Sequence, residues 1–390
     1  MYRKEDEFQL AAQYYSELVS KFPEALLPRL RLAEMNRSLN RHGESIQLLL
    51  QSLNSFPDSL DLVNDIGLHY LDTDCFDDAI DYFTRGISID PEHSGLTSNL
   101  AMTYELKGFF QQSNQLYRKA LTLDPTQPDA NHNLGLQLLL TGQYDEGWSY
   151  YEWRFAGTEQ KLLLVPRCMP LKEYRLDKNQ NILVIAEQGL GDTLQFMRYL
   201  RVLSTEVKEI FFCPQPPLSE IIRESNLPVT LLEPQEAEIK DNAYWLPLLN
   251  IPRHLNVRPN NPVCTEPYIR VDQNRINKWE DLFRNEPMPV VAINWQGNPN
   301  AERTSAKGRS VPLECFSILT EVQGFKFLSL QKGFGSEQLD TIGFSSRFVD
   351  FQGQVSNATD FCETAAVISN CSLVITSDTS VAHLAAGMGH

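Results

Sequence analysis

The N-terminal part of the chain repeats a pattern of apolar, small and polar positions at a constant interval of 34 residues. The interval is marked by prolines at Pro23, Pro57, Pro91 and Pro125. Small residues recur in the same step at Ala33, Gly67, Ala101 and Gly135, and again at Ala79, Ser113 and Gly147. The second small series is accompanied by large residues at Phe83, Tyr117 and Tyr151. This pattern predicts pairs of closely packed helices, with a proline in the turn after each second helix.

An interval of 34 residues is that of the tetratricopeptide repeat (TPR), and residues 1–157 resemble TPR proteins. Such repeats stack into a curved α superhelical solenoid whose first helices line a concave binding face. The chain enters at a second helix, Glu5 to Lys21, so the first repeat is expected to be incomplete. This helix either caps the array or follows a start that lies upstream.

One polar position on the expected concave face follows the same interval. It is occupied by Arg31, Asp65, Asn99 and Asn133. Asparagine can bond the backbone of an extended peptide through both its donor and its acceptor, and the O-linked N-acetylglucosamine transferases have an asparagine ladder of this kind. We therefore predict that Asp65, Asn99 and Asn133 bind a peptide or acceptor. The alternative is that asparagine is simply tolerated there.

From residue 181 the pattern changes to short apolar runs that alternate with helical stretches. The predicted strands cover 181–186, 209–213, 229–232, 290–295, 325–330, 347–351 and 373–377. A proline- and asparagine-rich passage at 246–267 interrupts the alternation. This pattern is typical of βαβ units with a parallel sheet. We predict a linker at 158–180 and two Rossmann-like domains, 181–285 and 286–390, with a cleft between them.

The loop after the first of these strands has the sequence EQGLGDTLQF. Gly189 and Gly191 permit a tight turn and a close approach to a ligand, while Asp192 and Thr193 stand where a helix begins. Leu194 occupies the place of the third glycine of a dinucleotide fingerprint, and no Walker lysine follows. The loop is thus a candidate anion or nucleotide site that is not specific for NAD.

The second α/β domain carries four polar stretches at predicted strand ends. Asn294 and Gln296 follow one strand, and Arg303, Lys307 and Arg309 lie in the loop behind it. Lys332 and Glu337 follow the next strand, and Asp378, Thr379, Ser380 and His383 follow the last. Carboxyl ends of parallel strands form the usual ligand edge of such sheets. Three cations there favour a phosphate site, although a solvated loop would have the same composition.

Together these motifs resemble the glycosyltransferases of the GT-B fold, in particular the heptosyltransferase-like (family 9) domain behind TPR arrays, as in bacterial relatives of the O-linked N-acetylglucosamine transferase and SPINDLY group. The motifs are QGLGDTLQF, NWQGN with RSVPL, SLQKG and SDTSVAHLAAG. The resemblance implies an enzyme that moves a sugar from a nucleotide-sugar co-substrate to a hydroxyl of a protein or glycan. The sugar transfer that the resemblance implies requires no metal and no further cofactor.

The same resemblance implies a role for each matched residue. Asp192 would be the general base, Arg309 would hold the donor diphosphate, and Glu337 would hold the ribose. Asp378, Thr379 and Ser380 would form the phosphate-binding helix start, with His383 just beyond. The remaining donor-side positions are Gly189, Gly191, Thr193, Asn294, Gln296 and Lys332.

Each of these positions also has a purely structural interpretation. Asp192 and Asp378 can be helix caps without any role in binding or catalysis, and His383 can be a core histidine. The family continues with further strands and a helix after the position of His390, so the second domain is expected to be incomplete. The alternative function is therefore a TPR protein-binding scaffold with a degenerate or incomplete glycosyltransferase domain. A nucleotide-sugar epimerase lacks support because no nicotinamide fingerprint is present.

The composition of the chain limits the classes of binding partner and the cellular location that we expect. The formal net charge is −16 and the isoelectric point is near 4.9, which disfavours binding to nucleic acid. Seven scattered cysteines without a C-x-x-C motif favour reduced thiols and a cytoplasmic location. The polar N-terminus does not resemble a signal peptide, and no transmembrane segment is expected.

Overall fold

The computed structural model describes residues 2–156, 162–171, 176–299, 302 and 308–390. The chain forms two compact units, Met1–Gly157 and Thr158–His390, which are described separately. The predicted cations Arg303 and Lys307 lie outside the described residues.

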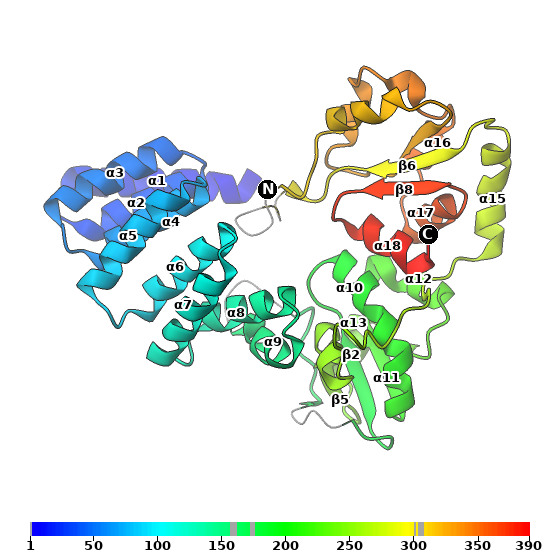
Figure 1. The fold of residues 1–390 in the computed structure, drawn as a ribbon, viewed down its shortest axis with the longest axis horizontal. Helices are drawn as coiled ribbons and strands as arrows, with labels where there is room; N and C mark the ends of the chain where they lie inside the picture. Colours follow the sequence, from blue (N-terminus) through cyan, green and yellow to red (C-terminus); the bar gives the residue numbers. More distant parts are fainter. Residues whose placement is uncertain (1, 157–161, 172–175, 300–301, 303–307) are drawn as a thin grey trace. The chain divides into compact units, whose positions relative to one another are not determined.

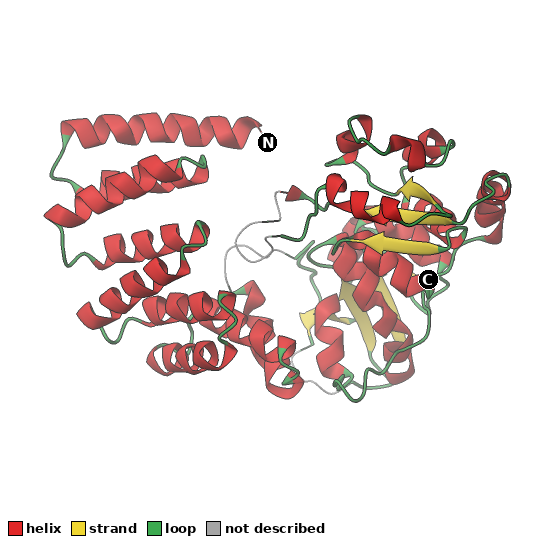
Figure 2. Ribbon diagram, turned by 45° about the horizontal axis from the view of Figure 1, so that its top comes forward, coloured by secondary structure: helices red, strands yellow, loops and turns green. Residues whose placement is uncertain are grey.

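The N-terminal unit is a stack of antiparallel helix pairs (Figure 2). Its helices are α1 (Tyr2–Lys21), α2 (Leu26–Ser38), α3 (His42–Ser55), α4 (Leu60–Asp72), α5 (Phe76–Ile89), α6 (Ser94–Leu106), α7 (Phe110–Leu123), α8 (Pro128–Leu140), α9 (Tyr144–Tyr151) and η1 (Glu152–Phe155). Helix α1 precedes the first complete pair, α2 and α3, and packs on α2. The prediction of a TPR-like solenoid is confirmed.

The small residues that recur every 34 positions are required by close contacts within each helix pair. A Cβ atom added to Gly67 on α4 would lie 2.4 Å from Cε1 of Phe83 on α5. At Gly135 it would lie 2.5 Å from a backbone nitrogen of α9. The turns inside the pairs also repeat, with left-handed residues at Asn40, Asp74, Gly108 and Gly142. The acidic residues around Asp74 therefore form the turn between α4 and α5. Asn, Asp and Gly adopt the positive φ of such a turn most readily.

The first sheet of the second unit is parallel throughout, in the order β1-β5-β2-β3-β4. Its strands are β1 (Met169–Pro170), β2 (Asn181–Ile185), β3 (Glu209–Cys213), β4 (Thr230–Leu231) and β5 (Tyr244–Pro247). The helices that accompany it are α10 (Leu190–Phe196), η2 (Met197–Tyr199), α11 (Leu200–Glu206), η3 (Pro216–Leu218), α12 (Ser219–Glu224), α13 (Pro234–Glu238), η4 (Leu248–Asn250) and α14 (Ile251–His254). Leu183, Ile185 and Phe211 form its buried core with Cys168.

The second sheet is also parallel, in the order β7-β6-β8. Its strands are β6 (Val290–Asn294), β7 (Lys326–Ser329) and β8 (Leu373–Thr376). The helices around it are η6 (Leu313–Glu321), η7 (Ser336–Asp340), η8 (Ser345–Arg347), α16 (Gln352–Ser356), α17 (Phe361–Ser369) and α18 (Ser380–Met388). Strand β6 is buried along its whole length, whereas β8 is an edge strand and Leu373 is half exposed.

Three sequence expectations for this unit need correction. The predicted linker 158–180 contributes β1, which pairs with β5. Strand β5 itself falls at the start of the passage that was expected to interrupt the sheet. The predicted strand at 347–351 is reduced to one parallel bridge between Phe327 and Phe348, because η8 occupies Ser345–Arg347. The parallel α/β class is confirmed in this unit.

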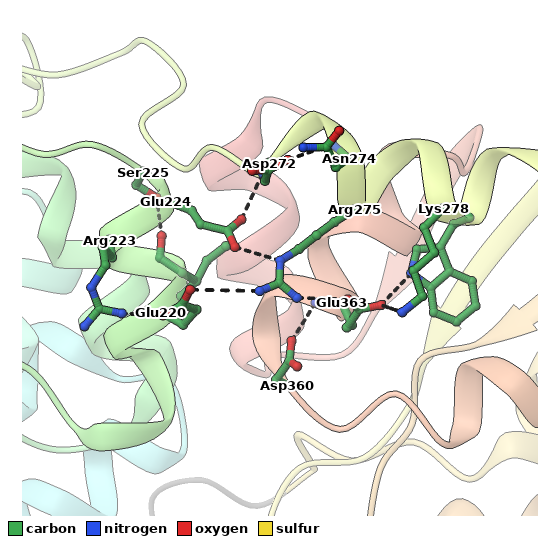
Figure 3. A network of polar contacts seen from close by, with 12 residues as sticks. Glu220, Arg223, Glu224, Ser225, Asp272, Asn274, Arg275, Lys278, Asp360 and Glu363 are labelled. Atoms are coloured by element: carbon green, nitrogen blue, oxygen red, sulfur yellow. Dashed lines mark hydrogen bonds and ion pairs between the residues drawn. The ribbon is translucent and has the colours of Figure 1, made fainter.

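Helix α15 (Gln273–Arg284) joins the two sheets through a network of charges, which we term the Arg275 hub (Figure 3). Arg275 donates from Nε to Glu224 of α12 at 2.7 Å and from Nη1 to Glu363 of α17 at 2.9 Å. Lys278 and Trp279 also donate to Glu363, both at 2.9 Å. The side chains of Glu224 and Glu363 are only 13% and 12% exposed, so this pairing offsets a substantial desolvation cost.

Candidate functional site

The loops after β2 and β8 bring two predicted motifs together in the second unit. Helix α10 follows β2, helix α18 follows β8, and the two helices pack against each other (Figure 1). At Gly191 an added Cβ atom would lie 2.9 Å from Cδ2 of His383 and 3.4 Å from Cα of Ser380. A larger residue at this position would therefore require the His383 ring of α18 to shift. We term this place the α10–α18 site.

Asp192 lies in the first turn of α10 and accepts a hydrogen bond from the backbone nitrogen of Gly189 at 2.9 Å. Gly189, and not Asp192, is thus the N-cap of α10, and Asp192 caps the helix start from its third position as part of a capping box. Burial raises the pKa of Asp192, while the Gly189 N–H and His383 partly oppose this effect. A partly buried carboxyl group with an elevated pKa retains the properties of a general base.

His383 of α18 is the second titratable group of the α10–α18 site. Burial lowers its pKa, although the carboxylates of Asp378 and Asp192 raise it. Its Nε2 lies 3.9 Å from Oδ1 of Asp378, which is largely exposed. The imidazole is therefore mainly neutral at pH 7. Carboxyl and imidazole groups with opposite pKa shifts in one place are typical of acid–base sites.

A buried polar network occupies the carboxyl end of β6. Asn294 donates to Gln331 at 3.0 Å and accepts from the Thr379 hydroxyl at 2.9 Å. The same oxygen of Gln331 accepts from the backbone nitrogens of Trp295 and Gln296 at 3.1 and 2.9 Å. The structure thus brings Asn294, Gln296 and Thr379 together. Gln331 was absent from the predicted site, although its position directly after a buried strand was a signal for it.

Arg309 lies beside the backbone after β6. An added Cβ atom at Gly297 would lie 3.4 Å from its Nη2 atom. The neighbouring Ser310 is engaged by Glu302, whose carboxylate accepts from the Ser310 nitrogen at 3.1 Å. The Nε atom of Arg309 is buried and has no hydrogen-bond partner among the residues that the structure describes. A guanidinium in this condition can accommodate an anion.

Three other predicted residues take different positions. Thr193 is completely buried and donates to Gln215 at 2.8 Å, so its hydroxyl fixes the loop. Lys332 donates to the Val355 carbonyl, and burial lowers its pKa to about 8. Glu337 is exposed on η7. The geometry therefore links Thr193 and Lys332 to internal contacts.

The predicted polar ladder in the N-terminal unit is partly occupied by internal bonds. Asn99 donates to Asn64 at 2.8 Å. Asp65 makes no hydrogen bond or ion pair with any described residue. It borders a pocket of about 320 Å³ between α2, α3 and α4. Of the three predicted binding residues, Asp65 is thus the one with an unused polar group in a pocket.

Comparison with known proteins agrees with the repeat architecture. Residues 116–148 match the sequence model of a tetratricopeptide repeat. A comparison with curated proteins gives no match. The matched segment runs from α7 to α9, within the helical unit.

Solved structures similar to this chain include the MamA protein, at 21% identity over 42% of this chain and 92% of that chain, with a TM-score of 0.33. MamA from Desulfovibrio magneticus RS-1 is 14% identical over 37% and 82% of the two chains, with a TM-score of 0.33. A TPR protein from Thermus thermophilus is 16% identical over 37% and 80%, with a TM-score of 0.35. Glycosyl transfer stays a prediction from the sequence motifs.

Two general features of the described residues complete the picture. None of their helices combines the length and the apolar character that a membrane crossing requires. In the same part of the chain, no group of three or more His, Cys, Asp or Glu residues is arranged to hold a metal ion.

Proposed function

We propose that this protein is a TPR scaffold that binds a protein segment on the helical face that carries Asp65. The observation that carries the proposal is the pocket between α2, α3 and α4, whose border carries a carboxylate that makes no hydrogen bond or ion pair with any described residue. A partly buried carboxylate that lacks a partner loses part of its hydration in the absence of a ligand. Stacked helix repeats present such groups on an extended face, where a bound segment can satisfy them.

Photo-crosslinking tests this proposal with the full chain. A benzophenone amino acid at Leu27, which lines the pocket and is 63% exposed, should label a protein partner in a cell extract. The same probe at Ile318 of the second unit, which is 66% exposed, is the matched control. The labelled band should weaken when Asp65 is replaced by Lys. Equal labelling from both positions, or labelling from Leu27 that is unchanged in the Asp65→Lys variant, would argue against a specific binding face.

A second candidate function is glycosyl transfer in the C-terminal unit, and the α10–α18 site favours it. In this reaction Asp192 would take the proton of an acceptor hydroxyl while the hydroxyl oxygen bonds to the anomeric carbon of the donor sugar. The bond from that carbon to the diphosphate oxygen breaks, and the nucleoside diphosphate leaves with the electron pair. The Nε of Arg309, which has no hydrogen-bond partner among the described residues, and the start of α18 would supply positive potential for this leaving group.

Thermal denaturation with UDP, GDP or ADP tests the second candidate. A nucleotide at one hundred times its Kd stabilises the folded protein by about 2.7 kcal/mol. One of the three should therefore raise the Tm, and Arg309→Ala should abolish the rise. Arg284→Ala, which removes an exposed cation from α15, should leave it intact. If none of the nucleotides shifts the Tm, the candidate is rejected and the scaffold proposal is unaffected.

A further inference from the structure

The pocket beside Asp65 has an apolar wall and a charged border. Leu27, Leu30 and Leu49 supply aliphatic surface, while the charged side chains come from α2 and α4. Its volume of about 320 Å³ is at the lower end of the roughly 300–1,000 Å³ typical of ligand pockets. A single long side chain with an apolar stem and a polar end suits a space of this size.

Of the charged side chains that line the pocket, the arginines have ion-pair partners, whereas Asp65 has none among the described residues. Arg31 donates to Glu34 at 2.7 Å, and Arg37 lies 3.5 Å from Asp72, which is not part of the pocket lining. Both cations therefore already have carboxylate partners. Asp65, in contrast, makes no hydrogen bond or ion pair with any described residue. The charge that remains available to a ligand is negative.

Burial disfavours the charged form of this carboxyl group. It raises the pKa of Asp65 to about 6, although Arg37 and Arg31 act in the opposite direction. The two arginines are thus too weakly coupled to Asp65 to compensate its desolvation. A cation inside the pocket would restore the lost stabilisation of the charged form.

We propose that this pocket, on the face of the proposed TPR scaffold, receives a lysine or arginine side chain of the bound segment and pairs its cationic end with Asp65. The methylene stem lies against Leu27 and Leu30, as long basic side chains do on apolar surfaces. Asp61, which is exposed at the border of the pocket, adds a second negative charge. This inference depends on the proposed binding function and adds the chemical class of the partner.

The test begins with selection of random dodecamer peptides by the full-length chain. The selected peptides should be enriched in lysine or arginine at one position. One such peptide, carrying arginine there, and its analogue with neutral citrulline are then compared by fluorescence anisotropy. The protein forms are the wild type, Asp65→Asn and the control Asp81→Asn, which removes an exposed charge from α5.

For the wild type, citrulline should weaken binding about tenfold, as expected for loss of one charge-assisted hydrogen bond. Asp65→Asn should weaken binding of the arginine peptide by a similar factor and should abolish the preference over citrulline. Asp81→Asn should retain that preference. The disappearance of the preference in one variant alone identifies Asp65 as the partner of the cation.

Two outcomes would overturn the inference in different ways. If peptides are selected without an enriched basic residue, or bind Asp65→Asn as tightly as the wild type, the cation pocket is wrong and the scaffold proposal stands. If the chain selects no peptide at all, both proposals fail. Circular dichroism of Asp65→Asn verifies that the helical unit is intact.

Discussion

Replacement of Asp65 by Asn should make the protein more stable at neutral pH. Burial raises the pKa of this carboxyl group from 3.8 to about 6. A folded-state pKa above the unfolded value means that the charged form costs stability. This cost is fully present above pH 6, declines as the pH falls, and is absent below pH 3.8. The ionised carboxylate of Asp65 therefore lowers the free energy of unfolding at neutral pH.

The size of this cost follows from the pKa difference. Each pKa unit corresponds to about 1.4 kcal/mol, which gives an upper value of roughly 3 kcal/mol for Asp65. The group is partly open to solvent, which screens its interactions, and the amide of asparagine also loses hydration in the pocket. We therefore expect Asp65→Asn to gain about 1–2 kcal/mol at pH 7.5.

Urea denaturation at two pH values measures the effect. The free energy of unfolding of the helical unit, followed by circular dichroism, should favour Asp65→Asn at pH 7.5, and the difference should nearly vanish at pH 4. The exposed-charge control Asp81→Asn should differ little from the wild type at pH 7.5. A variant that is no more stable than the wild type at pH 7.5, or a gain that persists at pH 4, would refute the assignment of a desolvated carboxylate.

Three further changes test packing and charge, with hydrogen exchange or denaturation resolved for each unit. Gly67→Ala should destabilise the helical unit by about 2 kcal/mol, because the new methyl would lie 2.4 Å from an aromatic ring, whereas Gly43→Ala has open space and should be neutral or slightly stabilising. Gly191→Ala should destabilise the second unit by about 1–2 kcal/mol through contact with the α18 imidazole, and Gly353→Ala, which meets no atom, should not. Arg275→Met should cost about 2–4 kcal/mol because the poorly exposed carboxylate of Glu224 loses its cationic partner and Glu363 retains only Lys278 and Trp279 among the described residues; an unchanged unfolding midpoint would contradict this role.

The sequence predicts the repeat unit well because its constraint is local and periodic. Gly67 and Gly135 are small for a steric reason that recurs at every helix pair, so spacing alone reveals the architecture. The strands of the second unit are less regular. Tyr244–Pro247 ends in proline and begins with an exposed tyrosine, and Met169–Pro170 is only two residues long. Neither has the apolar run by which a buried strand is recognised.

The candidate sites were predictable only to the level of the motif. The loop glycines and the strand ends placed Asp192, Asp378 and His383 among the important residues, and the structure brings them together at the α10–α18 site. The sequence does not show which side chains satisfy one another. Asn99 bonds Asn64 of the preceding repeat. Such pairing depends on the angle between neighbouring helices, which no periodicity encodes.

The Arg275 hub also constrains the order in which the chain can fold during synthesis. Its first acceptor, Glu224, lies 51 residues upstream, whereas Glu363 lies 88 residues downstream. At roughly 5–20 residues per second, the second acceptor emerges about 4–18 s after the arginine. During this interval α15 has only the contacts on one side of the hub. The hub therefore cannot link the two sheets until Glu363 has been synthesised, and this interval is when a nascent chain would need protection by a chaperone.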